Sequence, residues 1–110
     1  MNELTIKGKD LVRSGWGIVF SGKDEIKKIL ERDGVVYLLF DSEDEIPNNA
    51  SCVDQSGNIV WKIDAIGWVK NTTFANIYEK EGKLFVTTWS GFTCEINKKT
   101  GQVISKIFTK

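Results

Sequence analysis

Apolar and polar residues alternate over short stretches along most of the chain, and turn-forming residues separate the stretches. Residues 83–88 and 103–108 show this pattern and are rich in Val, Ile, Thr and aromatic side chains. Alternation at every second position is typical of a strand, and β-branched and aromatic side chains fit the pleated surface of a sheet. Lys80-Glu81-Gly82 and Ser90-Gly91 place glycine where a tight hairpin needs a positive φ angle. The pattern predicts short antiparallel strands and little helix.

The chain also repeats itself. Residues 20–37 match residues 68–85 at an offset of 48, with coinciding apolar positions and an acid-base-acid-Gly turn in both copies. Further along, residues 57–63 match residues 101–107 at an offset of 44. The first copy is therefore four residues longer, and we place the excess in a loop over residues 41–49. Self-similarity of this kind predicts two copies of one supersecondary unit.

One segment of the first copy has an ambiguous pattern. Residues 24–30 carry Ile26, Ile29 and Leu30 at helical spacing, behind a serine or aspartate that could cap a helix. The matching segment, residues 72–78, contains threonine, phenylalanine and isoleucine, which are poorer helix formers. We therefore favour a strand over a short helix in both places.

The turns of each copy and the strands around them carry a resemblance. Asp33-Gly34-Val35-Val36-Tyr37 is followed by the turn Asp54-Gln55-Ser56-Gly57 and then by Ile59-Val60-Trp61-Lys62-Ile63, and the second copy has the same order. This order resembles a β-propeller blade of the quinoprotein-like or WD type, with a D-G-x-V-Y strand, a D-x-x-T-G turn and a V-x-W-K-I strand. The resemblance implies two blade-like repeats, about residues 18–63 and 66–108.

Two blades are too few to close a propeller ring, which needs at least four. We therefore expect an all-β fold that is half-propeller-like or a sandwich of meanders, in one domain over residues 1–110. Its open flank would be covered by residues 4–12, by a partner chain, or by both. Cofactor binding in closed propellers depends on the assembled ring, so no cofactor-binding residue is carried over.

Composition narrows the class of protein. The 110 residues are 41% hydrophobic, enough for one core, and 15 basic residues balance 15 acidic ones. Strong nucleic-acid binding is disfavoured because it needs a basic excess on at least one face. No apolar run approaches the length that crosses a bilayer, and residues 1–10 lack a signal-peptide core. We expect a cytoplasmic protein.

Residues suited to catalysis or metal binding are scarce. Histidine is absent, and Cys52 and Cys94 have no C-x-x-C partner, so we expect buried thiols and no metal site. The chain has no G-x-S-x-G, and Ser14-Gly15-Trp16-Gly17 has neither the spacing nor the lysine of a phosphate loop, so a simple bend is expected there. No pair of carboxylates stands out as a glycosidase pair. We therefore expect neither an enzyme nor a cofactor.

One dense cluster of charge breaks the neutral pattern: Asp41, Glu43, Asp44 and Glu45 fall within five residues. A calcium loop would need glycine at the sixth position, where Ile46 stands. The remaining alternatives are a solvated loop of repelling charges and an acidic docking element on a rigid β scaffold.

Aromatic residues are the other candidate binding groups. Trp89 and Phe92 flank the turn at Ser90-Gly91 and could together anchor a protein partner or a sugar ring. Trp16, Trp61 and Trp68 are expected in the core, whereas Trp89 could lie in the core or at the surface.

These features favour a protein-binding module. In size, in its lone domain and in its acidic loop, the chain is similar to small bacterial immunity proteins, which protect a cell against a toxin delivered by its neighbours. This likeness implies that Asp41, Glu43, Asp44 and Glu45 mimic phosphates and block a basic nuclease domain, while Trp89 and Phe92 hold the complex. The alternative is a carbohydrate or small-ligand module that uses Trp89 and Phe92 with Asn71 and Thr72.

Overall fold

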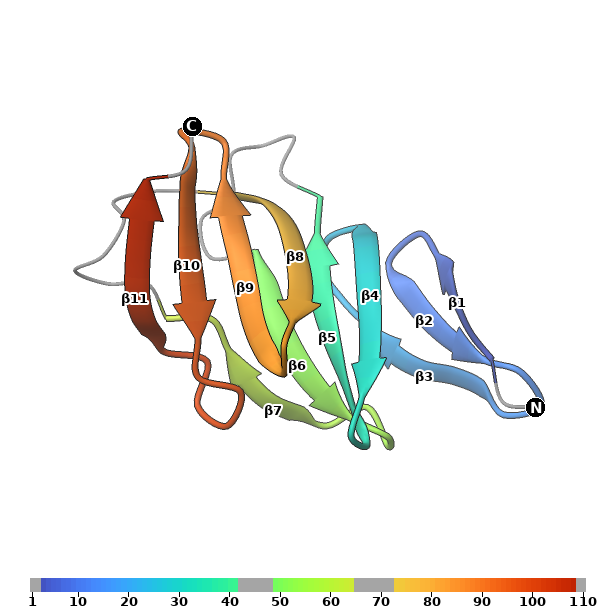
Figure 1. Cartoon of the computed structure of the whole chain (residues 1–110). Helices are drawn as coiled ribbons and strands as arrows, with labels where there is room; N and C mark the ends of the chain where they lie inside the picture. Colours follow the sequence, from blue (N-terminus) through green and yellow to red (C-terminus); the bar gives the residue numbers. More distant parts are fainter. Residues whose placement is uncertain (1–2, 42–48, 65–72, 109–110) are drawn as a thin grey trace.

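The computed structural model describes residues 3–41, 49–64 and 73–108. In these ranges the chain forms eleven strands in three antiparallel sheets and contains no helix, so none could span a membrane (Figure 1). Each sheet is a meander whose strands are neighbours in sequence. The all-β prediction is confirmed. The sheets are open and do not close into a ring.

The strands are distributed over the sheets in chain order. Sheet 1 contains β1 (Leu4–Lys7), β2 (Asp10–Arg13) and β3 (Gly17–Ser21). Sheet 2 contains β4 (Ile26–Arg32), β5 (Val35–Phe40), β6 (Ala50–Asp54) and β7 (Ile59–Lys62). Sheet 3 contains β8 (Phe74–Lys80), β9 (Lys83–Thr88), β10 (Phe92–Ile96) and β11 (Val103–Phe108). In the ambiguous segment, residues 24–30, the strand β4 begins at Ile26 and includes Ile29 and Leu30, so the helical alternative is wrong.

Sheets 2 and 3 share their hairpin geometry. The β4–β5 turn has positive φ angles at Asp33 (51°) and Gly34 (81°), and the β8–β9 turn has them at Glu81 (53°) and Gly82 (78°). Two consecutive positive φ angles define the two-residue type I′ turn, whose twist matches that of the flanking strands. Glycine in the second position takes this conformation without the strain that a side chain would cause.

The irregularities of the two sheets also correspond. Val60 in β7 and Ile104 in β11 are each the extra residue of a β-bulge and are about half exposed. In front of these strands, the Asp54 carboxylate accepts the Ser56 amide at 2.9 Å, and the Asn97 side chain accepts the Lys99 amide at 2.8 Å. In both turns a side-chain oxygen accepts the backbone N–H two residues further along, as Asp and Asn often do where a chain turns.

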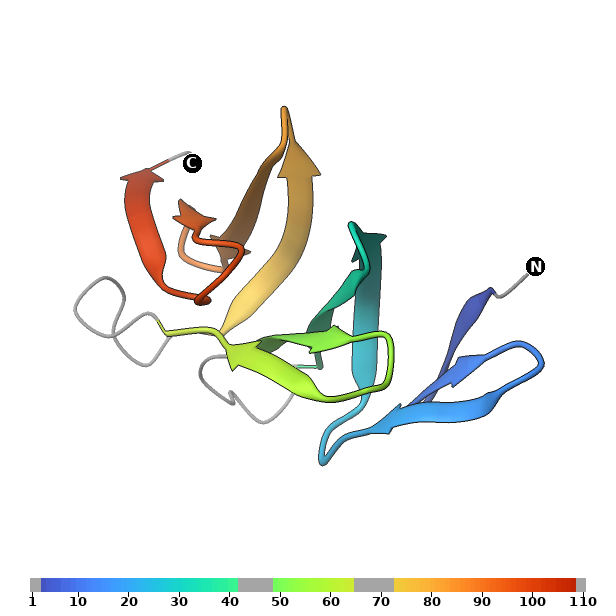
Figure 2. The same ribbon diagram turned by 90° about the horizontal axis from the view of Figure 1, so that it is seen from below.

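Sheet 2 lies between the other two sheets (Figure 2). Its central strand β5 is buried on both faces: Val36 and Leu38 belong to the cluster shared with sheet 1, and Tyr37 and Leu39 to the cluster shared with sheet 3. The continuous apolar run of β5 reflects this double burial, because alternate residues of a strand point to opposite faces. Sheet 1 closes one flank through Leu4, Ile6 and Leu11, as expected for residues 4–12.

The two buried thiols and Trp61 follow the predictions, whereas Trp16 does not. Cys52, Cys94 and Trp61 are buried, the last as a core residue with its indole N–H donating to the Lys98 carbonyl at 2.7 Å. Trp16 is 71% exposed, so its expected place in the core is wrong. It stands in the tight β2–β3 turn, at the tip of a hairpin where no other sheet packs. Trp68 lies outside the described residues.

The outer face of sheet 3 differs from the equivalent face of sheet 2. Across sheet 2, Tyr37, Cys52 and Trp61 form one row of side chains that packs on sheet 3. The matching row across sheet 3 is Phe85, Glu95 and Ser105. In the next row, Leu39 and Ala50 of sheet 2 are replaced by Thr87 and Thr93, and this row ends on β11 at the exposed Ile107. Glu95 and Ser105 thus make one row of this outer face more polar than its counterpart in sheet 2.

Candidate functional site

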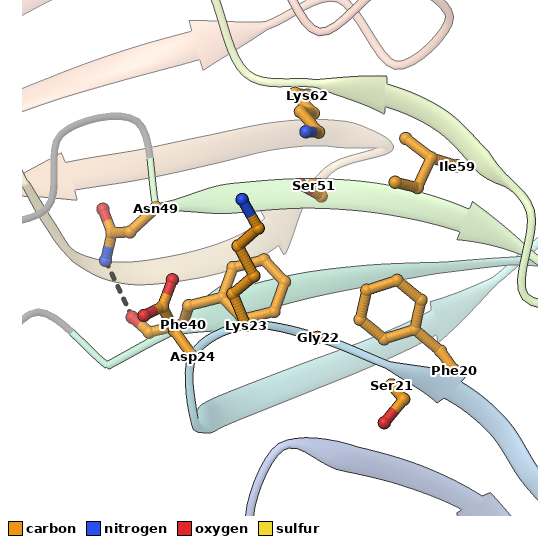
Figure 3. Close-up of a pocket in the computed structure, with 10 residues that line it drawn as sticks. All are labelled: Phe20, Ser21, Gly22, Lys23, Asp24, Phe40, Asn49, Ser51, Ile59 and Lys62. Atoms are coloured by element: carbon orange, nitrogen blue, oxygen red, sulfur yellow. Dashed lines mark hydrogen bonds between the residues drawn. The ribbon is translucent and has the colours of Figure 1, made fainter.

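A cavity of about 300 Å³ lies between the end of sheet 1 and the face of sheet 2 (Figure 3). One wall is formed by residues 20–24, which run from the end of β3 into the connection to β4. The opposite wall comes from sheet 2, where the lining side chains are Phe40, Asn49, Ser51, Ile59 and Lys62. The cavity therefore joins residues from three parts of the chain that are far apart in sequence.

The register of sheet 2 places its lining residues on one face. Ser51 pairs with Lys62 across β6 and β7, and Val53 pairs with Ile59. Val53 belongs to the core shared with sheet 1, so Ser51, Ile59 and Lys62 also point toward sheet 1. At Gly57, in the β6–β7 turn, an added Cβ would stand 1.8 Å from the Val19 carbonyl oxygen. β3 can therefore lie this close to sheet 2 beside the cavity only because residue 57 has no side chain.

An aromatic pair forms the apolar part of the lining. The ring centroids of Phe20 and Phe40 are 6.3 Å apart, with the ring planes tilted by 41°. Gly22 packs against both rings, since a Cβ there would lie 3.1 Å from Phe20 and 3.3 Å from Phe40. Ile59 completes the apolar side from β7 and is 51% exposed. A ligand with an apolar body would cover these groups.

Two lysines give the cavity a positive end. Figure 3 shows Lys23 reaching from the β3–β4 connection toward the strand that carries Ser51, with Lys62 beyond it. Neither ammonium group forms an ion pair within the described ranges of the chain. Asp24 is the one carboxylate among the lining residues that the structure describes, so these described side chains carry an excess of one positive charge at neutral pH.

Asn49, which lines the cavity, links sheet 2 to sheet 3 through its side chain. It is 2% exposed, and its side-chain N–H groups donate to the carbonyls of Phe40 (2.8 Å) and Phe74 (3.0 Å). Its side-chain oxygen accepts the Phe74 amide at 2.6 Å. These bonds tie the end of β5 to the start of β8, and hence sheet 2 to sheet 3. The reasoning from sequence missed this residue, although an asparagine directly before an apolar strand was a signal for such a link.

The acidic cluster is only partly described. Asp41 follows β5 directly, is half-buried, and donates its backbone amide to the Glu25 carbonyl at 2.7 Å. Glu43, Asp44 and Glu45 lie outside the described residues. The structure therefore shows where the acidic segment leaves sheet 2 and nothing of its carboxylates. Asn71 and Thr72 of the alternative ligand site also lie outside the described part of the chain.

Trp89 and Phe92 have different neighbours. Trp89 is 63% exposed, and the Lys27 ammonium from β4 lies 5.3 Å from its ring centroid. Phe92 is half-buried, with its ring 5.2 Å from that of Phe108 and the Lys106 ammonium 4.8 Å from its centroid. Both contacts are cation–π pairs. Trp89 thus belongs to the junction of β4 with sheet 3, and Phe92 to the β10–β11 pair.

The buried thiols have raised pKa values. Burial, followed by the negative charge of Asp54, raises the pKa of Cys52 to about 11, and burial raises the pKa of Cys94. A raised pKa lowers the thiolate fraction, and the thiolate is the reactive and metal-binding form. Among the described residues no group of three or more His, Cys, Asp or Glu side chains could hold a metal ion.

Comparison with known proteins places the chain in a family. Residues 1–108 match the family described as a domain of unknown function, DUF7957. The chain belongs to this family. No curated protein matches the DUF7957 chain.

Solved structures show a similar fold. One is the crystal structure of the computationally designed Ika8 protein, at a TM-score of 0.50 and 8% sequence identity. The match covers 100% of the DUF7957 chain and 48% of the designed protein, so the chain spans about half the length of that structure. At this identity the likeness concerns the fold alone.

Proposed function

We propose that this DUF7957 chain is a non-catalytic protein-binding module, and more specifically an immunity protein that blocks the nuclease domain of a cognate bacterial toxin. The observation that carries the proposal is the exposed apolar edge of sheet 3. Ile104, Ile107 and Phe108 on β11 are 50%, 60% and 60% exposed, and β11 is the last strand of its sheet.

An edge strand of this kind suits a protein partner. The Val103 N–H donates to the Asp64 carbonyl at 3.2 Å. Beyond Val103, the outward N–H and C=O groups of β11 face no other strand of the described ranges, so they can pair with a strand of another chain, while its side chains offer apolar contact area. Lys106 is the one charged residue of β11, and its ammonium lies over the Phe92 ring next to Phe108. This end of the strand therefore presents an aromatic pair, and aromatic residues are enriched in protein interfaces.

The acidic segment supports the choice of a basic partner. Four carboxylates in residues 41–45 create a local negative potential in a chain of zero net charge. Such a potential speeds association with a cationic nuclease cleft and is screened by salt. The proposal places the protein in the cytoplasm of the cell that it protects, because an immunity protein must meet the toxin at its target.

The first test of the proposal is protection from a defined toxin. We expect the gene next to this one to encode a large secreted protein with a basic nuclease domain at its end, and co-expression of the two to restore growth. Glu43→Gln with Glu45→Gln should lower the association rate about tenfold at low salt. The matched control, Glu3→Gln with Glu81→Gln, removes the same charge from exposed sites elsewhere and should leave the rate unchanged.

The second test addresses the edge strand. Ile107→Lys should weaken binding, whereas Ile18→Lys changes an equally exposed isoleucine at the far end of the molecule and should not. Failure of co-expression to protect would refute the immunity proposal. Equal effects of Ile107→Lys and Ile18→Lys would refute the β11 interface.

The exposure of Trp89 favours a second candidate, a carbohydrate-binding module. A sugar ring could stack on the indole, and the Lys27 ammonium beside it could contact a hydroxyl or acidic group of the sugar. The test is a glycan array combined with titration of tryptophan fluorescence, comparing the native chain with Trp89→Ala. A response that Trp89→Ala abolishes would support this function, and the absence of any response would exclude it.

A further inference from the structure

The cavity between sheets 1 and 2 has the properties of a ligand site for a small molecule. Its volume of about 300 Å³ is at the lower end of the range found for small-molecule sites. Such a volume fits one ring with a short substituent. The lining combines an apolar wall with a few polar groups, which is the usual composition of a ligand site.

The lining divides into an apolar part and a cationic part. Phe20, Phe40 and Ile59 supply apolar surface, and the two phenyl rings are tilted around Gly22. Lys23 and Lys62 supply two ammonium groups that form no ion pair with any described residue. Both lysines are exposed, so their side chains can turn toward an anion at the edge of the cavity, with which an ammonium group forms a charge-assisted hydrogen bond.

The two repeated sheets differ at this position in a way that agrees with a site. Ser51 lies between Leu38 and Lys62 in its row across sheet 2, and the matching row across sheet 3 is Val86, Cys94 and Lys106. Cys94 is fully buried in the core between sheets 2 and 3. On the cavity side of sheet 2, Ser51 thus supplies a hydroxyl, which donates and accepts strong hydrogen bonds. At the matching position in the packed core, Cys94 supplies a thiol, which forms only weak hydrogen bonds.

We propose that this cavity binds a small organic anion with an aromatic body, such as an aryl carboxylate. The ring lies against Phe20, Phe40 and Ile59, and the carboxylate accepts hydrogen bonds from Lys23, Lys62 and the Ser51 hydroxyl. Asp24 disfavours a second negative charge on the ligand, since it leaves the described part of the lining with one net positive charge. The site is separate from β11, so it does not depend on the proposed protein interface.

The test is a titration of the ¹⁵N-labelled full chain followed by NMR, with four probes of matched size or charge. Phenylacetate has both ring and charge, phenylacetamide has the ring alone, acetate has the charge alone, and benzylamine reverses the charge. We expect saturable shifts at the amides of Gly22, Asp24, Ser51 and Lys62 with phenylacetate, at a dissociation constant of about 1 mM or below. The other three probes should bind at least about tenfold more weakly.

Variants then test the lysines. Lys23→Met with Lys62→Met keeps side-chain length and removes both charges, and should weaken phenylacetate binding about tenfold or more, equivalent to about 1.4 kcal/mol. Lys99→Met, an exposed lysine in the β10–β11 turn, is the control and should bind as the native chain does. The amide spectrum of each variant shows whether the fold is retained, and Ser51→Ala provides a milder change if the double variant does not fold.

Several outcomes would overturn the proposal. They are shifts that do not saturate with phenylacetate, equal binding of phenylacetamide, and undiminished binding by a folded double lysine variant. Tighter binding of a capped Phe-Glu dipeptide than of phenylacetate would overturn it in favour of a protein side chain as the occupant. Protection against a toxin by the double lysine variant would leave the immunity proposal standing, so the two proposals fail separately.

Discussion

Asn49→Asp is the sharpest test of how sheets 2 and 3 are joined. The substitution keeps the shape of the side chain and replaces its two N–H donors by an oxygen acceptor. That oxygen would face the Phe40 and Phe74 carbonyls, which Asn49 now approaches at 2.8 and 3.0 Å. The bond from the Phe74 amide, at 2.6 Å, can persist because it needs only an acceptor.

The size of the effect follows from these contacts. Each lost hydrogen bond removes about 1 kcal/mol, and two buried carbonyls facing a carboxylate add a penalty of about 1 kcal/mol or more. The expected loss in free energy of unfolding is about 3 kcal/mol. With a urea m-value of about 2 kcal/mol/M for a domain of this size, the midpoint should fall by about 1.5 M.

A matched control makes the measurement specific. Asn97 uses its side chain as an acceptor for the Lys99 amide, and the equivalent turn of sheet 2 has Asp54 in the same role. Asn97→Asp makes the same chemical change where no donor is needed, so its midpoint should stay within about 0.3 M of the native value. Urea unfolding followed by tryptophan fluorescence measures both variants. Equal midpoints for Asn49→Asp and Asn97→Asp would refute the reasoning.

Three further predictions concern charge, thiols and the outer face of sheet 3. Lys98 and Arg32 lower the pKa of Glu79, so the stabilisation by its carboxylate is complete above the pKa of the unfolded chain and is lost as pH falls through the lowered pKa of the folded state. Between neutral and acid pH, the free energy of unfolding should therefore fall less in Glu79→Gln than in the native chain. Burial raises the pKa values of Cys52 and Cys94, so a thiol reagent at pH 8 should modify neither until urea unfolds the chain; fast labelling in the native state would contradict their burial. Glu95→Val with Ser105→Val makes the more polar row of the outer face of sheet 3 apolar and should produce dimers in sedimentation analysis; a monomer at high concentration would argue against a role of this polar row in preventing association.

Much of the local structure could be predicted because its causes are local. Gly34 and Gly82 favour type I′ turns, since glycine takes the positive φ angle of the second turn position without strain. Alternation of apolar and polar residues favours strands, because successive side chains of a strand point to opposite faces of the sheet. The burial of Cys52 and Cys94 follows from their place in such strands.

The candidate site could not be predicted in the same way. Phe20, Ser51 and Lys62 carry no motif, and their meeting depends on how closely the end of sheet 1 approaches the face of sheet 2. The burial of the tryptophan side chains could not be predicted from the sequence either. Trp16 and Trp61 are the same residue type, yet one lies in a solvent-facing turn and the other between two sheets.

By itself, the sequence determined the strands and the hairpins, because backbone geometry and side-chain alternation act over a few residues. Only the tertiary structure decided which faces meet, which row of side chains lies on the outer face of sheet 3, and where packing leaves the cavity beside Ser51 open. These features arise where separate sheets come into contact. They depend on the summed shape and burial of side chains far apart in the chain, which no local pattern encodes.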